Sequence, residues 1–525
     1  MLQTADYKHF HVVYPDGRVS PFEGALHAKP ALPGDTVEMQ KGMVSAVKRR
    51  VKHGPFVGVL ELASKMRFGM TSRNVPIYRF SPFSESYPPF FVGCSQPDTS
   101  RNMLVLVEFE HWDSGTCPRG NLIQTFGPCG DIPSEESALL SHACLTSWKR
   151  GEATTVQPPA PVPQIFKTVG DTFHIDPPGC KDIDDAVTIR ILDSTFVEVK
   201  IHIADVASWL ITNPSLKQKA ADIGQTYYRD GVAVKPMFPA NLSEGAFSLL
   251  PHQERQTFTL SFLYNRLDKT TSRTPTWSIE KTTVQNSYTY VTIYTSPFQA
   301  ILREITSCLA GRDLTDSHEW VEQLMLYYNR SAAAIIRLYG KGILRRHAGK
   351  DMERFATLQA IGLPAEKLAM YGGEYCLPTD ANTLHWGLGV DTYCHASSPI
   401  RRWADCINQM VLRKHLISNG TVFLADDQAE VDALNIRSKR AKGFERDTRF
   451  ARLLLGGTPN EPMTAIVAEV SAAKTKLWIP AWGRMITSYA EPNDSKPGDI
   501  VTATFFADPT KRSWKRRVVV NYLKG

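Results

Sequence analysis

The 525-residue sequence has no run of about 18 apolar residues, the length of a membrane-spanning helix, so we expect no segment that crosses a membrane. Its first ten residues hold no apolar core of the kind found in secretory signals, so we expect no signal peptide. Nine cysteines are scattered from Cys94 to Cys406, and no two of them form a C-x-x-C pair. This pattern disfavours a zinc site or a disulfide frame, and it favours reduced thiols and a cytoplasmic location.

Charge does little to narrow the function, because the formal net charge is only +7. Such a balance permits an anionic partner without demonstrating one. Basic residues gather in two places, Lys48–Lys52 near the start of the chain and Lys511–Arg517 near its end. Both clusters lie in or beside strand-like sequence, so each is either a basic sheet face or an ordinary solvated surface.

Roughly two to four domains are expected for a chain of this length. Residues 1–62 and 63–150 show short alternating strands separated by turn signals such as Pro15-Asp-Gly17, which predicts a small β-barrel or sandwich in each part. Residues 151–165 are rich in proline and form the predicted linker. Residues 166–455 mix strands with long helices, and the strands of residues 456–525 fit a five-stranded OB-type barrel.

The segment from Ile175 to Ala186 holds four aspartates within ten residues, together with two prolines and a glycine. The prolines and the glycine exclude a regular helix or a central strand, so we expect a shaped loop. Crowded carboxylates repel one another at neutral pH unless a proton or a cation intervenes, and hard oxygen ligands suit Mg²⁺ or Mn²⁺. A solvated acidic turn or a structural calcium loop is the alternative, although the spacing is not that of an EF-hand. The aspartates are Asp176, Asp182, Asp184 and Asp185.

Two helices are predicted after this loop. Residues 321–336 carry apolar side chains at helical spacing. A second helix is expected over residues 398–412, with Ser398 as its N-cap and a proline at the first helical position. This placement puts Arg401 and Arg402 in the first turn, where positive charge opposes the helix dipole and anions are favoured. A docked phosphate explains such an arrangement, and an interdomain salt bridge is the structural alternative.

The aspartate segment resembles the signature of the RNase II/RNase R exoribonucleases, the RNB-domain family. Other blocks resemble that family in the same order. Phe126-Gly-Pro-Cys-Gly-Asp131 looks more like the eukaryotic, exosome-related branch than the bacterial one. The other blocks are Ile201–Val206, Pro236–Pro239, Trp386–Gly389 and Tyr393–Asp405.

The resemblance implies an α+β multidomain protein. An RNB catalytic domain at residues 166–455 would be flanked by two N-terminal cold-shock-type β-barrels and one C-terminal OB-type β-barrel. The nuclease domain that precedes these barrels in some eukaryotic members has no room here. The implied activity is hydrolytic 3′→5′ degradation of single-stranded RNA to nucleoside 5′-monophosphates, by a two-metal mechanism that uses Mg²⁺ or else Mn²⁺.

The resemblance also implies roles for individual residues. All four aspartates would be metal ligands, and Asp184 matches the position most closely tied to the chemical step. Arg401 matches the arginine that meets the scissile phosphate, and Arg402 is a second candidate. Three further positions match a tyrosine that stacks on a 3′-terminal base, a clamp tyrosine at the last nucleotide, and a helix glutamate that reaches its ribose. These are Tyr228, Tyr290 and Glu322.

Two other functions stay open at this point. One is a catalytically retired RNA-binding or regulatory protein on the same frame, and the other is an endonuclease or a DNA-directed enzyme with the same metal centre. The expected partner is single-stranded RNA, bound by a monomer. An exosome-type partner is compatible with the resemblance, but no residue indicates one.

Overall fold

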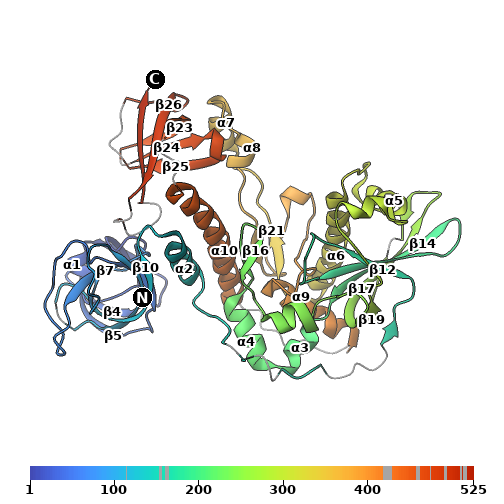
Figure 1. Cartoon of the computed structure of the whole chain (residues 1–525), viewed down its shortest axis with the longest axis horizontal. Coiled ribbons are helices and arrows are strands. Elements are labelled where there is room, and N and C mark those ends of the chain that lie inside the picture. The colour runs from blue at the N-terminus through green and yellow to red at the C-terminus, as the bar shows by residue number, and fades with distance from the viewer. Residues whose placement is uncertain are drawn as a thin grey trace. The chain divides into compact units, whose positions relative to one another are not determined.

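A computed structural model describes the chain except for residues 114, 150, 153–155, 160–164, 273, 418–427, 457–460, 473, 490–493, 509–510, 512–516 and 525. Most of the predicted linker and of the C-terminal basic cluster therefore lies outside the described residues. The chain divides into two compact units (Figure 1). The first comprises Met1–Leu145, Ala356–Ala365 and Gly443–Gly525, and the second comprises Thr146–Phe355 and Glu366–Lys442.

The chain begins with a three-stranded sheet and a separate hairpin that share one apolar core. Phe10 is fully buried there, with its ring stacked on Phe22 at a centroid distance of 4.9 Å. Asp35 is also fully buried, but its carboxylate is satisfied: Oδ2 accepts from Leu32 N at 3.0 Å, and Oδ1 lies 2.8 Å from His53 Nε2. The elements are β1 (Leu2–Thr4), β2 (His9–Val13), β3 (Val19–Glu23), α1 (Ala25–Ala28), β4 (Thr36–Gln40) and β5 (Met43–Arg49).

The next five strands form a closed barrel in the order β10-β8-β7-β6-β9. Strand β6 (Phe56–Leu60) pairs with β7 and β9 in this barrel. The predicted boundary at residue 62 places this strand in the first β region instead, and the pairing corrects that boundary. Leu60 explains the pairing, because it belongs to the buried core of this barrel, and Phe56 packs against the same core. Helix α2 (Ile132–Ala143) follows, with Asp131 as its N-cap. The other strands are β7 (Ile77–Pro82), β8 (Phe90–Gly93), β9 (Met103–His111) and β10 (Arg119–Pro128).

The C-terminal region forms a five-stranded sheet in the order β25-β24-β23-β26-β27. Its two edge strands meet where Ser488 Oγ donates to the carbonyl oxygen of Val520 at 3.3 Å, so the sheet curls toward a barrel. Arg517 ties this sheet to helix α2, because its Nη1 donates to Glu135 Oε2 at 2.5 Å and both side chains are 1% exposed. The strands are β23 (Met463–Ser471), β24 (Lys474–Ile479), β25 (Arg484–Ser488), β26 (Ile500–Ala507) and β27 (Val518–Lys524).

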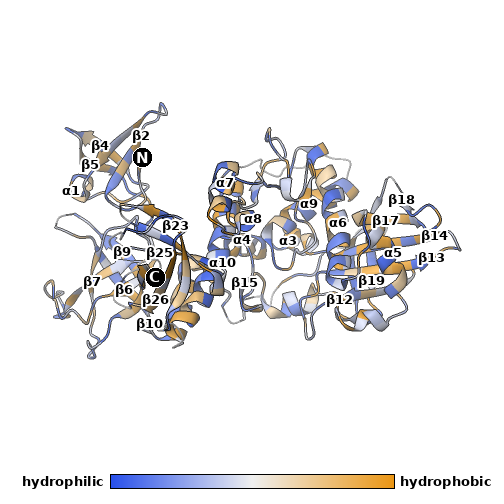
Figure 2. Cartoon of the chain, turned by 90° about the horizontal axis from the view of Figure 1, so that it is seen from above, coloured by the Kyte–Doolittle hydropathy of each residue, from blue (hydrophilic) through white to orange (hydrophobic). Residues whose placement is uncertain are grey.

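An eight-stranded sheet dominates the second unit, in the order β11-β19-β17-β14-β13-β12-β20 with β18 paired to β17. Val187, Ile201 and Leu260 lie side by side on one buried face, and Figure 2 shows hydrophobic residues along β17 of this sheet. The strands are β11 (Phe166–Lys167), β12 (Asp171–Ile175), β13 (Asp185–Ile191), β14 (Phe196–Ala204), β17 (Glu254–Asn265), β18 (Thr270–Thr271), β19 (Thr276–Thr283) and β20 (Asn286–Tyr288). Two hairpins, β15 (Tyr227–Arg229) with β16 (Val232–Lys235) and β21 (Leu344–Arg346) with β22 (Glu374–Cys376), lie outside it.

The long helix predicted over residues 321–336 is confirmed as α6 (Ser317–Tyr339), and α10 (Gln428–Leu455) contributes to both units. None of the helices in the described residues is long and apolar enough to cross a membrane. The other helices are α3 (Ala207–Thr212), α4 (Pro214–Ile223), α5 (Gln299–Ala310), α7 (Met352–Ala360), α8 (Ala365–Leu368) and α9 (Trp403–Ile417).

The predicted start of a helix at Ser398 is wrong, because α9 begins at Trp403. Tertiary hydrogen bonds hold the preceding residues in a turn. Asp405 Oδ1 accepts from Ser398 N at 2.8 Å, and Asp184 Oδ1 accepts from Ile400 N at 2.9 Å. Arg401 therefore lies before the helix rather than in its first turn.

Candidate active site

The acidic segment is an irregular loop between β12 and β13, as predicted. Backbone contacts fasten its second half to the sheet. Ala204 N donates to the carbonyl oxygen of Asp184 at 2.9 Å, and Ile183 N donates to Ser248 Oγ at 3.0 Å. The loop thus presents its carboxylates from a fixed backbone at the end of the central strands.

Asp184 is the most enclosed of the four carboxylates, with only 4% of its surface exposed. Its Oδ1 accepts from Ile400 N at 2.9 Å, and its Oδ2 lies 3.2 Å from Nε of Arg401. Burial raises the pKa of Asp184 to about 7, because the Arg401 guanidinium and the Ile400 amide offset the lost hydration only in part. This carboxyl group therefore changes its charge near neutral pH in the metal-free protein.

Asp185 and Asp176 crowd the same region. Burial, followed by the charges of Asp176 and Asp184, raises the pKa of Asp185 well above its ordinary value. Asp176 has a partner of its own, since its Oδ2 lies 2.9 Å from His174 Nδ1. Burial raises the pKa of Tyr228, and the charges of Asp182 and Asp184 add to the effect, so both carboxylates interact with this residue.

The donor chemistry of this cluster fits a hard divalent cation, because it consists of carboxylate oxygens whose mutual repulsion a cation would relieve. In the described part of the chain, however, no three His, Cys, Asp or Glu side chains stand close enough together to hold a metal ion as they are placed. Asp184 uses its oxygens for Ile400 and Arg401, and Asp176 is held by His174. The four-aspartate ligand set therefore stays a prediction.

Arg401 is carried to Asp184 by backbone pairing between distant segments. Thr226 N donates to the carbonyl oxygen of Arg401 at 3.0 Å, and Trp403 N donates to that of Gly224 at 2.9 Å. This pairing also brings the phenol of Tyr228 close to the guanidinium of Arg401, and each affects the pKa of the other. Burial opposes the charge on Arg401, but Asp184 and then Tyr228 raise its pKa above the ordinary value. Its side chain is still 47% exposed, so the guanidinium remains within reach of a ligand.

Arg402 points into different surroundings. Its Nη2 donates to Asp405 Oδ1 at 2.8 Å, and Asp405 is fully buried. Burial disfavours the charge on Arg402, while Asp405 and then Tyr375 raise its pKa. Arg402 is thus committed to an internal ion pair, and its RNA-binding role stays a prediction.

Tyr290 interacts with a different pair of carboxylates from Tyr228. Burial raises the pKa of Tyr290 to about 12, with the charges of Asp185 and Asp176 adding to the effect, so its hydroxyl faces these two groups. Its ring is stacked on His318, with centroids 3.9 Å apart and planes inclined by 6°. Glu322 is exposed on α6 one helical turn after His318, on the same face of the helix. The structure therefore places Tyr228, Arg401 and Tyr290 near the carboxylates. Glu322 lies one helical turn beyond the histidine that stacks on Tyr290.

Sequence reasoning missed three side chains that support this site. His174 was detectable, because it precedes Asp176 by two residues at the end of a strand and so shares its direction. His318 precedes Glu322 by four residues, which places the two on one helix face. Asp405 follows Arg402 by three residues, a spacing at which side chains of opposite charge can pair.

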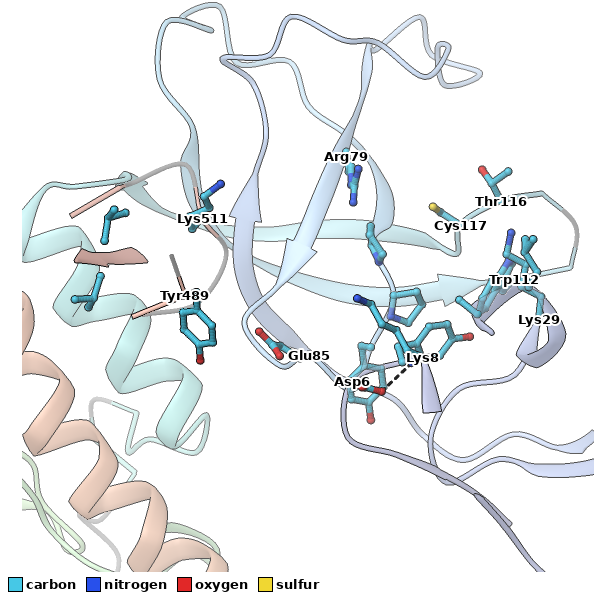
Figure 3. A pocket seen from close by; sticks show the side chains of 18 of the residues that line it. Asp6, Lys8, Lys29, Arg79, Glu85, Trp112, Thr116, Cys117, Tyr489 and Lys511 are labelled. Atoms are coloured by element: carbon cyan, nitrogen blue, oxygen red, sulfur yellow. Dashed lines mark hydrogen bonds between the residues drawn. The ribbon is translucent and has the colours of Figure 1, made fainter. Parts of the chain in front are cut away.

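The first unit contains a cavity of about 900 Å³ that is lined by residues from its two N-terminal β regions and from the C-terminal sheet. Figure 3 shows four cationic side chains around it, together with Trp112 and Tyr489. Asp6 and Glu85 are acidic members of the lining. Cations interleaved with aromatic rings are what a single-stranded nucleic acid binds. The cations are Lys8, Lys29, Arg79 and Lys511.

Comparison with known families supplies two matches within this chain. The RNB domain matches residues 168–305 and 291–418, and a Dis3-like cold-shock domain 2 matches residues 77–144. The exosome complex exonuclease RRP44 of Homo sapiens is 23% identical over 509 residues, which covers 78% of this chain and 53% of that protein. Ribonuclease R of Helicobacter pylori is 24% identical over 360 residues, covering 54% of this chain and 55% of that protein. The chain thus spans about half the length of these relatives.

Solved structures share the fold. RNase R of Mycoplasma genitalium in complex with ribose-methylated single-stranded RNA superposes with a TM-score of 0.76 at 14% identity and covers 99% of both chains. Yeast Ssd1, described as a pseudonuclease, has a TM-score of 0.67 at 15% identity and covers 96% of this chain and 81% of its own. At such low identity these likenesses concern the fold alone. Together with the family matches they confirm the predicted α+β multidomain architecture, in which cold-shock and OB-type domains accompany an RNB domain.

Proposed function

Because the chain belongs to the RNB family, with similarity to its exosome-related exonucleases, we propose that it is a hydrolytic 3′→5′ exoribonuclease. Its substrate would be single-stranded RNA and its product nucleoside 5′-monophosphates. Family membership supports a nuclease in general. We propose the 3′→5′ direction, the RNA substrate and the two-metal mechanism in addition to that general activity.

The observation that carries the proposal is the contact between Asp184 and Arg401. Residues 217 positions apart in the chain place an enclosed carboxylate 3.2 Å from a guanidinium that is half exposed. A buried ion pair of purely structural origin would enclose both partners. Here the cation is left accessible, and further carboxylates lie beside it at a raised pKa.

The residues divide the work of hydrolysis among them. Asp176, Asp182, Asp184 and Asp185 would hold divalent cations, Mg²⁺ or Mn²⁺. Such cations supply the charge that activates a water molecule and stabilises the leaving 3′-oxygen. Arg401 would leave Asp184 for the scissile phosphate, where its planar group pairs with two oxygens. Water attacks phosphorus, the bond to the 3′-oxygen breaks, and the shortened RNA keeps a 3′-hydroxyl.

Substrate positioning falls to the aromatic and basic residues. We assign Tyr228 to stacking on a base near the 3′ end, Tyr290 to clamping the last nucleotide, and Glu322 to its ribose. Stacking on an aromatic ring contributes about 1–3 kcal/mol per base and is indifferent to sequence, which suits an enzyme that degrades RNA of any sequence. The cavity of the first unit would hold RNA further from its 3′ end, through its cations and rings.

The second candidate is a catalytically retired RNA-binding or regulatory protein. Yeast Ssd1, described as a pseudonuclease, has the same fold, so the fold does not decide between the two functions. The chemistry-bearing residues favour the enzyme, because all four aspartates and Arg401 are present in this chain.

The decisive experiment follows a 5′-labelled single-stranded RNA incubated with the protein and Mg²⁺. The expected result is progressive shortening from the 3′ end with release of nucleoside 5′-monophosphates, and EDTA should stop it. A DNA strand of the same sequence should persist. RNA that is bound but unchanged in both Mg²⁺ and Mn²⁺ would instead establish the retired binding protein.

Circular single-stranded RNA is the matched control, because it offers the same phosphodiesters without a 3′ end. An exonuclease leaves it intact, whereas linearisation would identify an endonuclease. We also propose that the chain acts as a monomer in the cytoplasm. Elution of the protein with a monomer's mass at micromolar concentration would agree with this.

A further inference from the structure

We propose that His318 is a positioning residue for catalysis, whose imidazole fixes the ring of Tyr290 against the carboxylate cluster. The inference rests on the proposed exoribonuclease function and extends it to a residue that the sequence did not single out. It starts from an unusually close stacking geometry at the edge of the candidate site.

The stack itself is the first observation. The centroids of the two rings lie 3.9 Å apart and their planes are inclined by 6°, so the imidazole of His318 lies over one face of the Tyr290 ring. Isolated aromatic pairs favour offset or edge-to-face arrangements with centroids about 4.5–7 Å apart. So close a parallel arrangement indicates that the surrounding backbone holds both rings.

The backbone contacts identify what holds them. Ser317 Oγ donates to the carbonyl oxygen of Tyr290 at 2.7 Å, so the first residue of α6 grips the backbone that carries the tyrosine. Asp316, the N-cap of α6, accepts from His318 N at 2.9 Å, and its same oxygen lies 3.0 Å from His318 Nδ1. The imidazole is therefore oriented by the cap at one edge while its face rests on Tyr290.

The consequence for Tyr290 is a fixed phenol direction. Asp176 N donates to the carbonyl oxygen of Tyr288 at 3.1 Å, so the segment that carries Tyr290 is paired with the start of the acidic loop. Burial raises the pKa of Tyr290, and the charges of Asp185 and Asp176 add to the effect, which agrees with this placement. Free rotation of an unstacked, half-buried tyrosine would swing the hydroxyl away from them. With one face covered by His318, the phenol is directed to where the terminal nucleotide must lie if the carboxylates bind its phosphate.

A purely structural role as a helix cap is the competing explanation, and variants separate the two. His318→Ala removes both the ring and the contact with Asp316. His318→Phe keeps a flat ring for the stack but loses the Nδ1 contact. Glu319→Ala is the control on the same helical turn, because Glu319 pairs with Arg312 and takes no part in the stack.

The expected result is a split between kcat and KM. His318→Ala should lower kcat about tenfold with KM within about twofold, since misplacing a group near the reacting atoms affects the chemical step more than binding of the remaining RNA. His318→Phe should stay within about twofold of wild type, as should Glu319→Ala. Full activity of His318→Ala, or a loss in His318→Phe equal to that in His318→Ala, would overturn the proposal.

A double-mutant cycle with Tyr290→Ala tests whether His318 acts through the tyrosine. If it does, adding His318→Ala to that variant should change kcat by less than about twofold, because the group to be positioned is already absent. Independent, multiplicative losses would contradict the proposal.

A readout without catalysis distinguishes failure of this inference from failure of the proposed function. In protein labelled at its tyrosines, the NMR signals of the Tyr290 ring, assigned with Tyr290→Phe, should be shifted upfield by the stacked imidazole. The shift should vanish in His318→Ala and persist in His318→Phe. A wild-type protein that shows the shift but degrades no RNA refutes the enzyme and leaves the stack standing, whereas the absence of the shift refutes the stack itself.

Discussion

Two buried carboxylates, Asp35 in the first unit and Asp184 in the second, differ in how well their partners offset the loss of hydration. Burial pushes the pKa of Asp35 up, but His53 and the amides of Leu32 and Val51 bring it below the ordinary value. Burial raises the pKa of Asp184 to about 7, and its partners do not compensate. The hydrogen bonds of Asp35 offset the effect of its burial, whereas the positive charge near Asp184 does not offset the effect of its burial.

The difference is the one expected between a structural carboxylate and a carboxylate that binds a ligand. A buried group that is fully hydrogen-bonded stabilises the fold and has no capacity left for a ligand. A buried group that is incompletely neutralised lowers stability and keeps an affinity for cations. Asp185, whose pKa burial, Asp176 and Asp184 raise, belongs to the second kind.

The largest effect should come from removing the functional charge. Asp184→Asn should lower turnover of RNA by about 1000-fold, because charge is lost where the transition state needs it, while RNA binding stays within a few-fold of wild type. Single-turnover kinetics and a binding titration measure the two quantities. Hydrolysis at the wild-type rate in this variant would show that Asp184 is not a catalytic group.

Removing the structural charge should have the opposite profile. Asp35→Ala should lower the free energy of unfolding by about 3 kcal/mol, since it leaves His53 and two amides without their acceptor. The rate of RNA degradation per folded molecule should not change. Chemical denaturation monitored by tryptophan fluorescence measures the loss, and unchanged stability would remove Asp35 from the class of satisfied acids.

Replacing Arg401 tests whether turnover depends only on the positive charge beside Asp184 or also on the planar shape of the guanidinium group. Arg401→Lys keeps the positive charge beside Asp184 but cannot pair with two phosphate oxygens, so we expect turnover to fall about 30-fold. Stability should stay within about 1 kcal/mol of wild type, because the side chain is half exposed. A loss of activity that is explained by a loss of folded protein would instead show that Arg401 stabilises the fold.

The smallest expected effect is the pH dependence of the free energy of unfolding, to which Asp184 should contribute. The pKa of Asp184 is raised in the folded state, so its contribution is complete below the unfolded value near 4 and is lost as pH rises through about 7. In EDTA the free energy of unfolding should therefore fall by on the order of 1–2 kcal/mol between pH 5 and pH 8. Asp184→Asn should flatten this slope, and Mg²⁺ should reduce it in the wild type, whereas a slope unchanged in Asp184→Asn would contradict the assignment.

Much of this arrangement was predictable from sequence, because the acidic loop and the long helix carry local signals. Prolines and a glycine mark the loop around Asp176, and apolar periodicity marks α6. The start of α9 was not predictable, because Ser398 and its proline form an ordinary helix-start pattern that tertiary hydrogen bonds override. The stack of His318 on Tyr290 was likewise hidden, since it joins a loop to a helix 28 residues away.

The bond between Ile400 N and Asp184 also has a bearing on biosynthesis. Its two halves leave the ribosome far apart in time, since about three quarters of the polypeptide must be made before the segment at Ile400 appears. A nascent chain that has not reached this point has the acidic loop but not the arginine. In the ribonuclease that we propose, the pair of Asp184 and Arg401 therefore forms only after most of the polypeptide has been made.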